Sequence, residues 1–380
     1  MPNPFPGSLA FNSPLRAWML ASWVLIAATP AVAFDFIVTR YDDPVPDGCL
    51  VADCSIREAV IAANVDLAAD RVWLSAGVYQ VNLAGSFEDN AATGDIDLVQ
   101  NVEIVGAGAT MTFIDGTGLG ETPIATAGNL GLVTAIRNLT VQNSASSGLL
   151  LSTGTHTVED CGFRDNGFGS TGPGIATTVQ SVVTILRTTV VGSAGVGLSV
   201  AQGSATVENS TFSGNGNQEI VLNFAAAFSC THCTVLASDA DPVLTVIGAT
   251  ASLANSIFAG ACSAVSGGAI NSLGGNVEST GHTCGFTQGS DQDDVTAGAL
   301  ALGALDDNGG PTRTHLPGAA SAANGSANDA LCFVDDQRGV VRETNCESGA
   351  VERTNVAVAT PIFHDGFLQG DSEAWSARVE

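Results

Sequence analysis

Nine cysteines are the residues of this chain with the clearest potential for chemistry. Three pairs are close enough in sequence to predict disulfides in an oxidising compartment: Cys49 with Cys54, Cys262 with Cys284, and Cys332 with Cys346. Cys230 and Cys233 form a CxxC whose pairing stays open, and Cys161 is left without a partner. A zinc site and thioredoxin-like chemistry are both disfavoured, because no second CxxC, spaced histidine pair or βαβ pattern accompanies the motif.

Paired carboxylates could supply the acid and base of a glycosidase. Such pairs occur at four places: Asp42 and Asp43, Asp293 and Asp294, Asp306 and Asp307, and Asp335 and Asp336. All of them lie towards the ends of the chain, and each is predicted to be a solvated loop. We therefore expect no catalytic, cofactor-binding or metal-binding residue.

The histidines show no spacing typical of a metal site. They lie at positions 156, 232, 282, 315 and 364. The segment SDQDD (290–294) could hold a hard cation such as calcium through oxygen ligands, but it lacks the glycine and distal glutamate of an EF-hand loop. No cofactor is expected, and calcium stays open without a supporting ligand set.

A nine-residue pattern recurs along the middle of the chain. The copies are IRNLTVQNS (136–144), VEDCGFRDN (158–166), ILRTTVVGS (185–193), VENSTFSGN (207–215), CTHCTVLAS (230–238) and LANSIFAGA (253–261). Their starts are 22, 27, 22, 23 and 23 residues apart. A period of this length is typical of a solenoid rather than of a compact globular fold.

Two columns of the repeat predict how each coil is built. The sixth position is always apolar and is predicted to stack in the core: Val141, Phe163, Val190, Phe212, Val235 and Phe258. The first position is also apolar, yet positions five apart in a straight strand face opposite sides, so the chain must bend between them. The third position supplies that turn, with residues that tolerate a left-handed backbone at Asn138, Asp160, Asn209 and Asn255. His232 stands in this turn column and is predicted at a surface corner.

These features predict an all-β fold, a single-stranded right-handed parallel β-helix of 22–27-residue coils with a short N-terminal capping helix. The capping helix is expected in CSIREAVIAAN (54–64), where Ser55 and Glu58 stand at capping-box spacing. It would close the exposed edge of the first coil.

The two ends resemble a known group of proteins. DGCLVADCSIREAVIAAN (47–64) is similar to the CSLREA segment of secreted bacterial β-helix proteins with the pectin-lyase-like fold, with Ile56 in place of leucine. The segments 273–280, 305–324 and 336–352 resemble the choice-of-anchor Q region of the same proteins. Pectate-type lyases share this fold and use calcium with an arginine or lysine base, but this chain has no lysine and its coil arginines do not converge.

The expected organisation has five parts. They are a signal peptide (1–33), an N-terminal cap (34–98), the β-helix coils (99–270), a choice-of-anchor-Q-like region (271–353), and a linker and C-terminal tail (354–380). The signal peptide is expected from the apolar run at 17–28 followed by Ala31-Val32-Ala33, a small-residue cleavage pattern. About twelve apolar residues are too few to span a bilayer, which takes roughly 20, so no membrane span is expected after its removal.

The charge of the chain restricts its partners. The formal net charge is −26, with 38 acidic residues against 12 arginines. Nucleic acid is therefore a poor partner, because its phosphates would be repelled. We expect a secreted or outer-surface protein without catalysis that serves adhesion or glycan contact, with an extracellular polysaccharide or a cell-surface component as partner. A polysaccharide lyase or glycoside hydrolase is the alternative.

Overall fold

The computed structural model describes residues 32–65, 67–86, 88–238 and 241–353. The predicted signal peptide, apart from its last two residues, and the predicted linker and tail lie outside the described residues. No helix within the described ranges is long and apolar enough to cross a membrane.

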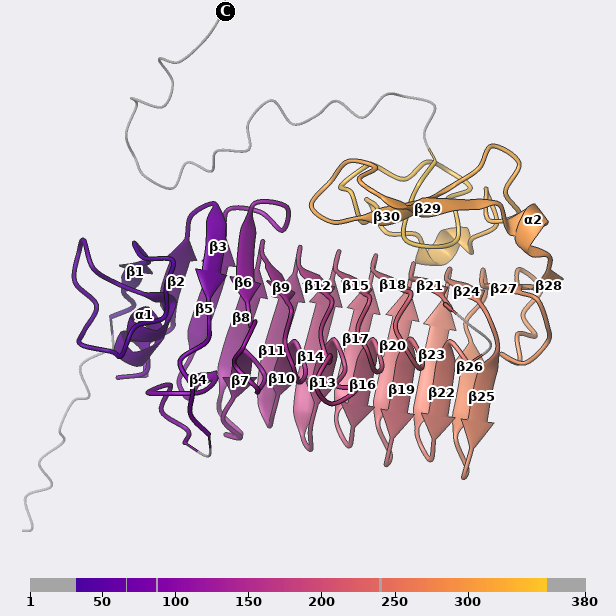
Figure 1. The fold of residues 1–380 in the computed structure, drawn as a ribbon. Helices are drawn as coiled ribbons and strands as arrows, with labels where there is room; N and C mark the ends of the chain where they lie inside the picture. Colours follow the sequence, from indigo (N-terminus) through magenta and orange to yellow (C-terminus); the bar gives the residue numbers. More distant parts are fainter. Residues whose placement is uncertain (1–31, 66, 87, 239–240, 354–380) are drawn as a thin grey trace, which may run out of the picture. The chain divides into compact units, whose positions relative to one another are not determined.

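The described chain forms three parallel sheets that run along a stack of coils (Figure 1). The first sheet has ten strands: β1 (Asp35–Ile37), β2 (Asp70–Leu74), β5 (Val102–Gly106), β8 (Val133–Arg137), β11 (Gly154–Glu159), β14 (Ser181–Leu186), β17 (Ser204–Glu208), β20 (Ala227–Thr231), β23 (Thr250–Ala254) and β26 (Ala269–Ser272). The second also has ten: β3 (Gly77–Gln80), β6 (Thr112–Asp115), β9 (Thr140–Gln142), β12 (Gly162–Arg164), β15 (Thr189–Val191), β18 (Thr211–Ser213), β21 (Thr234–Leu236), β24 (Ile257–Ala259), β27 (Val277–Ser279) and β28 (Gln292–Val295). The third has eight: β4 (Ile96–Leu98), β7 (Ile124–Thr126), β10 (Leu149–Leu151), β13 (Ile175–Thr177), β16 (Leu198–Ala201), β19 (Ile220–Asn223), β22 (Leu244–Ile247) and β25 (Cys262–Val265).

Each coil takes one strand from each sheet in turn, and equivalent strands of successive coils pair in parallel. Val158 of β11, for example, is in register with Ile136 of the coil before it and Ile185 of the coil after it. The first position of the repeat thus stacks on itself from coil to coil. This arrangement confirms the predicted all-β parallel β-helix.

The sixth-position column fills the interior beneath the second sheet. Its six residues pair in order from β9 to β24, and all are fully buried: Val141, Phe163, Val190, Phe212, Val235 and Phe258. Valine and phenylalanine alternate along this column, so large rings sit between smaller neighbours. Such alternation of volumes favours dense packing of the core.

The N-terminal end is closed by helix α1 (Ile56–Ala63). Ser55 caps this helix by accepting a hydrogen bond from the Glu58 amide, and the Glu58 carboxylate accepts from the Ser55 amide. The first complete coil, β2 to β4, already begins at Asp70. All three sheets therefore begin before residue 99, and the first two extend past residue 270, beyond the range 99–270 expected from the repeat.

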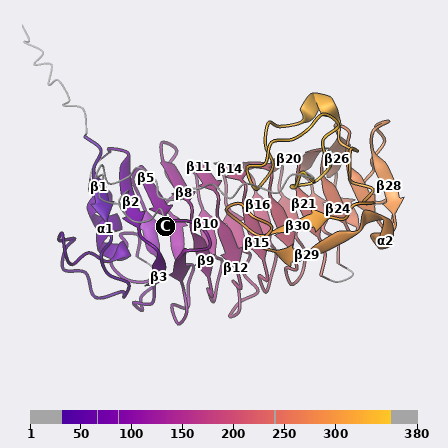
Figure 2. The same ribbon diagram turned by 90° about the horizontal axis from the view of Figure 1, so that it is seen from above.

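The C-terminal segment folds back along the coils. It contains α2 (Ala297–Leu300), the antiparallel pair β29 (Leu302–Asp306) and β30 (Thr314–Pro317), and a 3₁₀ turn over Asp329–Leu331. Figures 1 and 2 show this segment beside the later coils. Its hydrogen bonds to residues between Arg187 and Gly275 hold it there, for example from Thr312 to the Arg187 carbonyl and from Ser348 to the Gly275 carbonyl.

Candidate functional site

The turn column bends the chain and also receives the C-terminal segment. Asn138, Asp160, Asn209 and Asn255 all have a positive φ, between 44° and 57°. Asparagine and aspartate adopt this left-handed conformation at low cost. Two of them then bond outward: Asn209 Oδ1 accepts from Arg342, and Asn255 Oδ1 accepts from the Asn328 amide.

The prediction that His232 lies at a surface corner is wrong. His232 does have the positive φ of a turn residue, 54°, but it is fully buried. The C-terminal segment covers this corner and brings the Gly349 carbonyl to 3.3 Å from Nδ1. Burial lowers the pKa of His232 to about 3, so its imidazole is neutral.

Four disulfides are present, and all nine cysteines of the sequence lie among the described residues. The structure joins Cys49 to Cys54, Cys262 to Cys284 and Cys332 to Cys346, and it also joins the CxxC pair, Cys230 to Cys233. Cys161, which the sequence leaves without a partner, is a buried free thiol. Burial raises the pKa of this thiol to about 12, which leaves it unreactive.

Two of the acidic pairs are not solvated loops, which corrects the prediction for them. Asp43 is buried and receives two hydrogen bonds from the fully buried Arg57 of α1, at 2.7 and 2.9 Å. Asp336 is buried and pairs with Arg338 at 2.8 Å. Each carboxylate neutralises an arginine that locks one end region in place, so neither is arranged as a catalytic acid.

The SDQDD segment uses its carboxylates within the protein. Asp291 accepts from the Ser272 hydroxyl at 2.6 Å and from the Asn276 amide at 3.0 Å. Asp293 pairs with the exposed His282, and this bond raises the pKa of His282. The segment thus closes the last coil.

A ladder of ion pairs runs along the end of the first sheet. Glu103 accepts from both Arg71 and Arg137 at 2.8 Å. Glu159 in turn contacts Arg137 and Arg187. Each of these arginines is therefore paired with a glutamate of an adjacent coil.

A pocket lies on the outer face of the second sheet, and we call it the Arg164 pocket. It has a volume of about 140 Å³ and lies between β6, β9, β12 and β15 on one side and residues 311–313 on the other. Its lining includes Phe113, Thr140, Gly162, Arg164 and Arg313. None of its twelve lining residues, all of them described, is acidic.

Strand register aligns a row of polar side chains that leads to Arg164 at the pocket. Asp115, Gln142 and Arg164 occupy matching positions on adjacent strands. Gln142 donates to Asp115 at 2.8 Å, and its oxygen accepts two hydrogen bonds from Arg164, one of them from Nε at 2.7 Å. The guanidinium also lies 5.1 Å from the centre of the Phe113 ring. Gln142 and the Phe113 ring therefore hold the Arg164 guanidinium in place, and its N–H groups that do not bond to Gln142 can bind a ligand.

The floor and the far wall of the pocket are set by small and polar residues. Gly162 leaves the floor open, because a Cβ there would lie 2.4 Å from the Thr140 hydroxyl oxygen. The far wall is fixed by Thr189, which donates to the Arg313 carbonyl at 2.6 Å. The fully buried Gln337 reinforces this wall by donating to the hydroxyls of Thr189 and Thr312. These hydrogen bonds fix the backbone of Arg313, whereas its side chain is exposed.

Sequence reasoning did not find this pocket. The pairing of Gln142 with Arg164 on adjacent strands could be predicted from the sequence, since both stand at the seventh position of the repeat. Arg313 lies in a segment whose docking position no periodicity indicates, so its approach to Arg164 had no signal in the sequence.

Comparison with known proteins supports the fold. Residues 124–284 match the family model described as "Right handed beta helix region". No curated protein matches the chain.

Three solved structures show similarity at low identity. A pectate lyase, Pel9A, is 12% identical over 85% of this chain and 97% of its own, with a TM-score of 0.47. The A-modules of the Azotobacter vinelandii mannuronan C-5 epimerases AlgE4 and AlgE6 are 15% and 14% identical. They cover 63% and 60% of this chain and 89% and 87% of their own, with TM-scores of 0.26 and 0.22. The parallel pairing of the coils and the family-model match together identify a right-handed parallel β-helix.

Proposed function

We propose that this chain is an exported β-helix protein that binds the carboxylate groups of an acidic polysaccharide, without catalysis, through the Arg164 pocket. The observation that carries the proposal is the composition of that pocket: two arginines, threonines and an aromatic ring, with no acidic residue in its lining. In a chain of net charge −26, a concave site without acids is a local exception. Arginine is suited to such a role because its planar donors match a carboxylate.

The size of the pocket favours a local contact with one or two sugar units. Its volume of about 140 Å³ is smaller than the roughly 300–1,000 Å³ of pockets that enclose a drug-sized ligand. The net negative charge of the rest of the chain also opposes the approach of a long polyanion. We therefore expect short oligouronates to bind with less electrostatic penalty per sugar than the long polymer.

Export is the second element of this proposal. Eight of the nine cysteines are in disulfides, and disulfides persist mainly in oxidising compartments. The apolar segment at 17–28 is the expected export signal. Mass spectrometry of the protein recovered from outside the cytoplasm tests this element, and a mature N-terminus near Phe34 is the expected result.

Calorimetric titration with short oligouronates tests the binding. The unmodified protein should bind them, and added salt should weaken binding because the contact is charge-assisted. Arg313→Gln should lower the affinity at least tenfold, since Arg313 is an exposed lining residue. Arg71→Gln is the matched control, because Arg71 belongs to the ion-pair ladder and not to the pocket.

The same titration separates the alternatives. Equal binding of a neutral glucan would contradict carboxylate recognition. Release of unsaturated uronates or of new reducing ends during incubation would contradict the non-catalytic role and support a lyase or hydrolase instead.

A further inference from the structure

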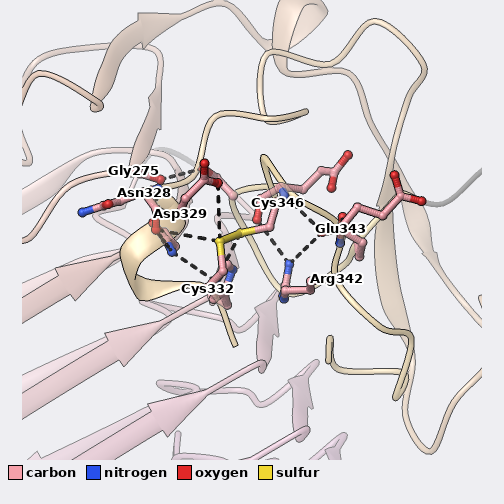
Figure 3. The surroundings of a disulfide bond; sticks show 12 residues. Gly275, Asn328, Asp329, Cys332, Arg342, Glu343 and Cys346 are labelled. Atoms are coloured by element: carbon pink, nitrogen blue, oxygen red, sulfur yellow. Dashed lines mark hydrogen bonds and ion pairs between the residues drawn. A yellow bond between two sulfur atoms is a disulfide. The ribbon is translucent and has the colours of Figure 1, made fainter. Parts of the chain in front are cut away.

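The disulfide between Cys332 and Cys346 lies directly against a histidine. Cys346 Sγ is 3.8 Å from His232 Nε2, and the two sulfurs and a ring nitrogen of His232 all lie within 4.8 Å of one another. Figure 3 shows this bond between the segment that carries Asn328 and Asp329 and the segment that carries Arg342 and Glu343. No other group of three His, Cys, Asp or Glu residues among the described ranges brings potential ligand atoms together in this way.

The hydrogen bonds of His232 leave the correct nitrogen facing the sulfurs. Nδ1 lies 3.3 Å from the Gly349 carbonyl, an acceptor, so Nδ1 carries the proton. Nε2 is therefore the lone-pair nitrogen, and it accepts a hydrogen bond from Asn255 Nδ2 at 3.1 Å. A metal ion on Nε2 would replace this bond, and Asn255 Nδ2 would keep its second acceptor, the Asn328 carbonyl at 3.2 Å. Metal-bound histidines usually donate their second N–H to a carbonyl or carboxylate in this manner.

The site is enclosed on one side and open on the other. His232 and Cys346 are fully buried, whereas Cys332 is only partly buried. A small reductant can therefore reach the bond from the Cys332 side while the core around His232 stays intact. The Cys230–Cys233 and Cys262–Cys284 pairs are buried at both ends, whereas Cys49 of the Cys49–Cys54 pair is also only partly buried.

We propose that Cys332, Cys346 and His232 form a binding site for a thiophilic metal ion such as Zn²⁺ when the disulfide is reduced. The step needs a reductant, which is a small thiol or a phosphine. Two electrons from it cleave the S–S bond, and each sulfur takes up one proton. With a thiol reductant, two thiol molecules supply the protons and become a disulfide. With a phosphine, water supplies the protons and its oxygen passes to the phosphine, which becomes a phosphine oxide. Binding of Zn²⁺ then releases both protons, leaving two thiolates and one neutral imidazole on the metal.

The geometry suits this exchange. Zinc binds sulfur at about 2.3 Å and nitrogen at about 2.0–2.1 Å, so tetrahedral ligands lie roughly 3.5–3.8 Å apart. The 3.8 Å between Cys346 Sγ and His232 Nε2 already matches that spacing. The two Cα atoms of the cysteines are 6.5 Å apart, which leaves room for the sulfurs to separate by rotation about their side chains.

This site is separate from the Arg164 pocket, so the proposal does not depend on the proposed glycan binding. The probe is Co²⁺, which replaces zinc and gives a thiolate-to-metal absorption band. The full chain is reduced with a phosphine under native conditions, freed of it, and titrated with Co²⁺. We expect one Co²⁺ per reduced chain, with a charge-transfer band, and no such band in the oxidised protein.

Two variants make the test specific. His232→Asn removes the imidazole. Asparagine already occupies the equivalent turn position in two neighbouring coils, as Asn209 and Asn255, so the coil should still fold. It should weaken Co²⁺ binding at least tenfold. The double variant Cys49→Ala with Cys54→Ala removes the other disulfide that has a partly buried cysteine, and it should leave the Co²⁺ spectrum unchanged.

Three results would overturn the proposal. They are a Cys332–Cys346 bond that resists reduction as long as the protein stays folded, a reduced protein without the charge-transfer band, and a band that His232→Asn does not weaken. Peptide mapping of alkylated cysteines distinguishes the first result from the other two.

Discussion

Phe212 is the residue that tests the core column most directly. Its ring is fully buried between Val190 and Val235 of the adjacent coils. Phe212→Ala should lower the free energy of unfolding by about 3–5 kcal/mol, because the coils cannot close over the cavity that is left. Phe168→Ala is the control, since this phenylalanine is 70% exposed and its loss should cost less than about 0.5 kcal/mol. Equal midpoints for the two variants in urea unfolding would show that the column is not core.

Cys161 offers a second test at this scale. It is the free thiol of the chain, and it is completely buried. A thiol reagent should therefore modify no cysteine of the native, oxidised protein and one cysteine per chain after unfolding in denaturant. Mass spectrometry of the labelled chain reads out both states. Rapid labelling of native protein at Cys161 would contradict the coil alignment.

The turn column shows how one element can serve two purposes. Asn138 and Asn209 have the same role in their coils, with φ values of 57° and 44°. Asn209 additionally donates to the Asp335 carbonyl and accepts from Arg342. Asn138→Ala should lower the free energy of unfolding by about 1 kcal/mol, because alanine is strained in the left-handed conformation of this turn. Asn209→Ala should cost about 1–3 kcal/mol more, because a buried donor of Arg342 loses its acceptor. Equal unfolding midpoints of the two variants would mean that the C-terminal segment adds no stability at this corner.

The capping helix depends on a buried ion pair. Arg57 of α1 is fully buried, and besides Asp43 it bonds to the carbonyls of Ala91, Gly94 and Asp95. Asp43→Ala should lower the free energy of unfolding by about 3–5 kcal/mol, since it leaves a buried charge uncompensated. Asp42→Ala is the matched control, because Asp42 pairs with Arg40 in an exposed position and little change is expected. Chemical unfolding followed by circular dichroism measures both.

At the scale of the whole molecule, the coils were predictable and their covering was not. Val141, Phe163 and Phe212 could be assigned to one column because a parallel stack repeats its side-chain pattern at a fixed period. The burial of His232 could not, because the segment that covers it lies more than 100 residues further along the chain and has no repeat of its own. The Arg164 pocket was missed for the same reason. Periodicity gives the contacts within the stack, whereas docking of an irregular segment depends on tertiary packing.

Two buried acids, Asp97 in the first coil and Glu347 in the C-terminal segment, make the stability of the protein depend on pH. Burial raises the pKa of Asp97 to about 7. Burial, with the neighbouring Glu352 carboxylate, raises the pKa of Glu347 to about 8. Both groups hold a proton in the folded state at a pH where the unfolded chain has lost it. Their contribution to stability is therefore complete below about pH 4, the usual range for free carboxyls, and is lost as the pH rises through 7 and 8.

Between pH 7 and 9 this loss should lower the free energy of unfolding by about 1 kcal/mol. The buried histidines add little in that window. Burial lowers the pKa of His156 and His315, and they are largely neutral there in both states. Glu347→Gln replaces the protonated carboxyl by a neutral amide. The free energy of unfolding of this variant should therefore depend less on pH, and at pH 9 it should be at least as high as that of the unmodified protein. Urea unfolding of both proteins at pH 7, 8 and 9 checks this. An unchanged slope in Glu347→Gln would show that Glu347 is already ionised in the folded protein at pH 7.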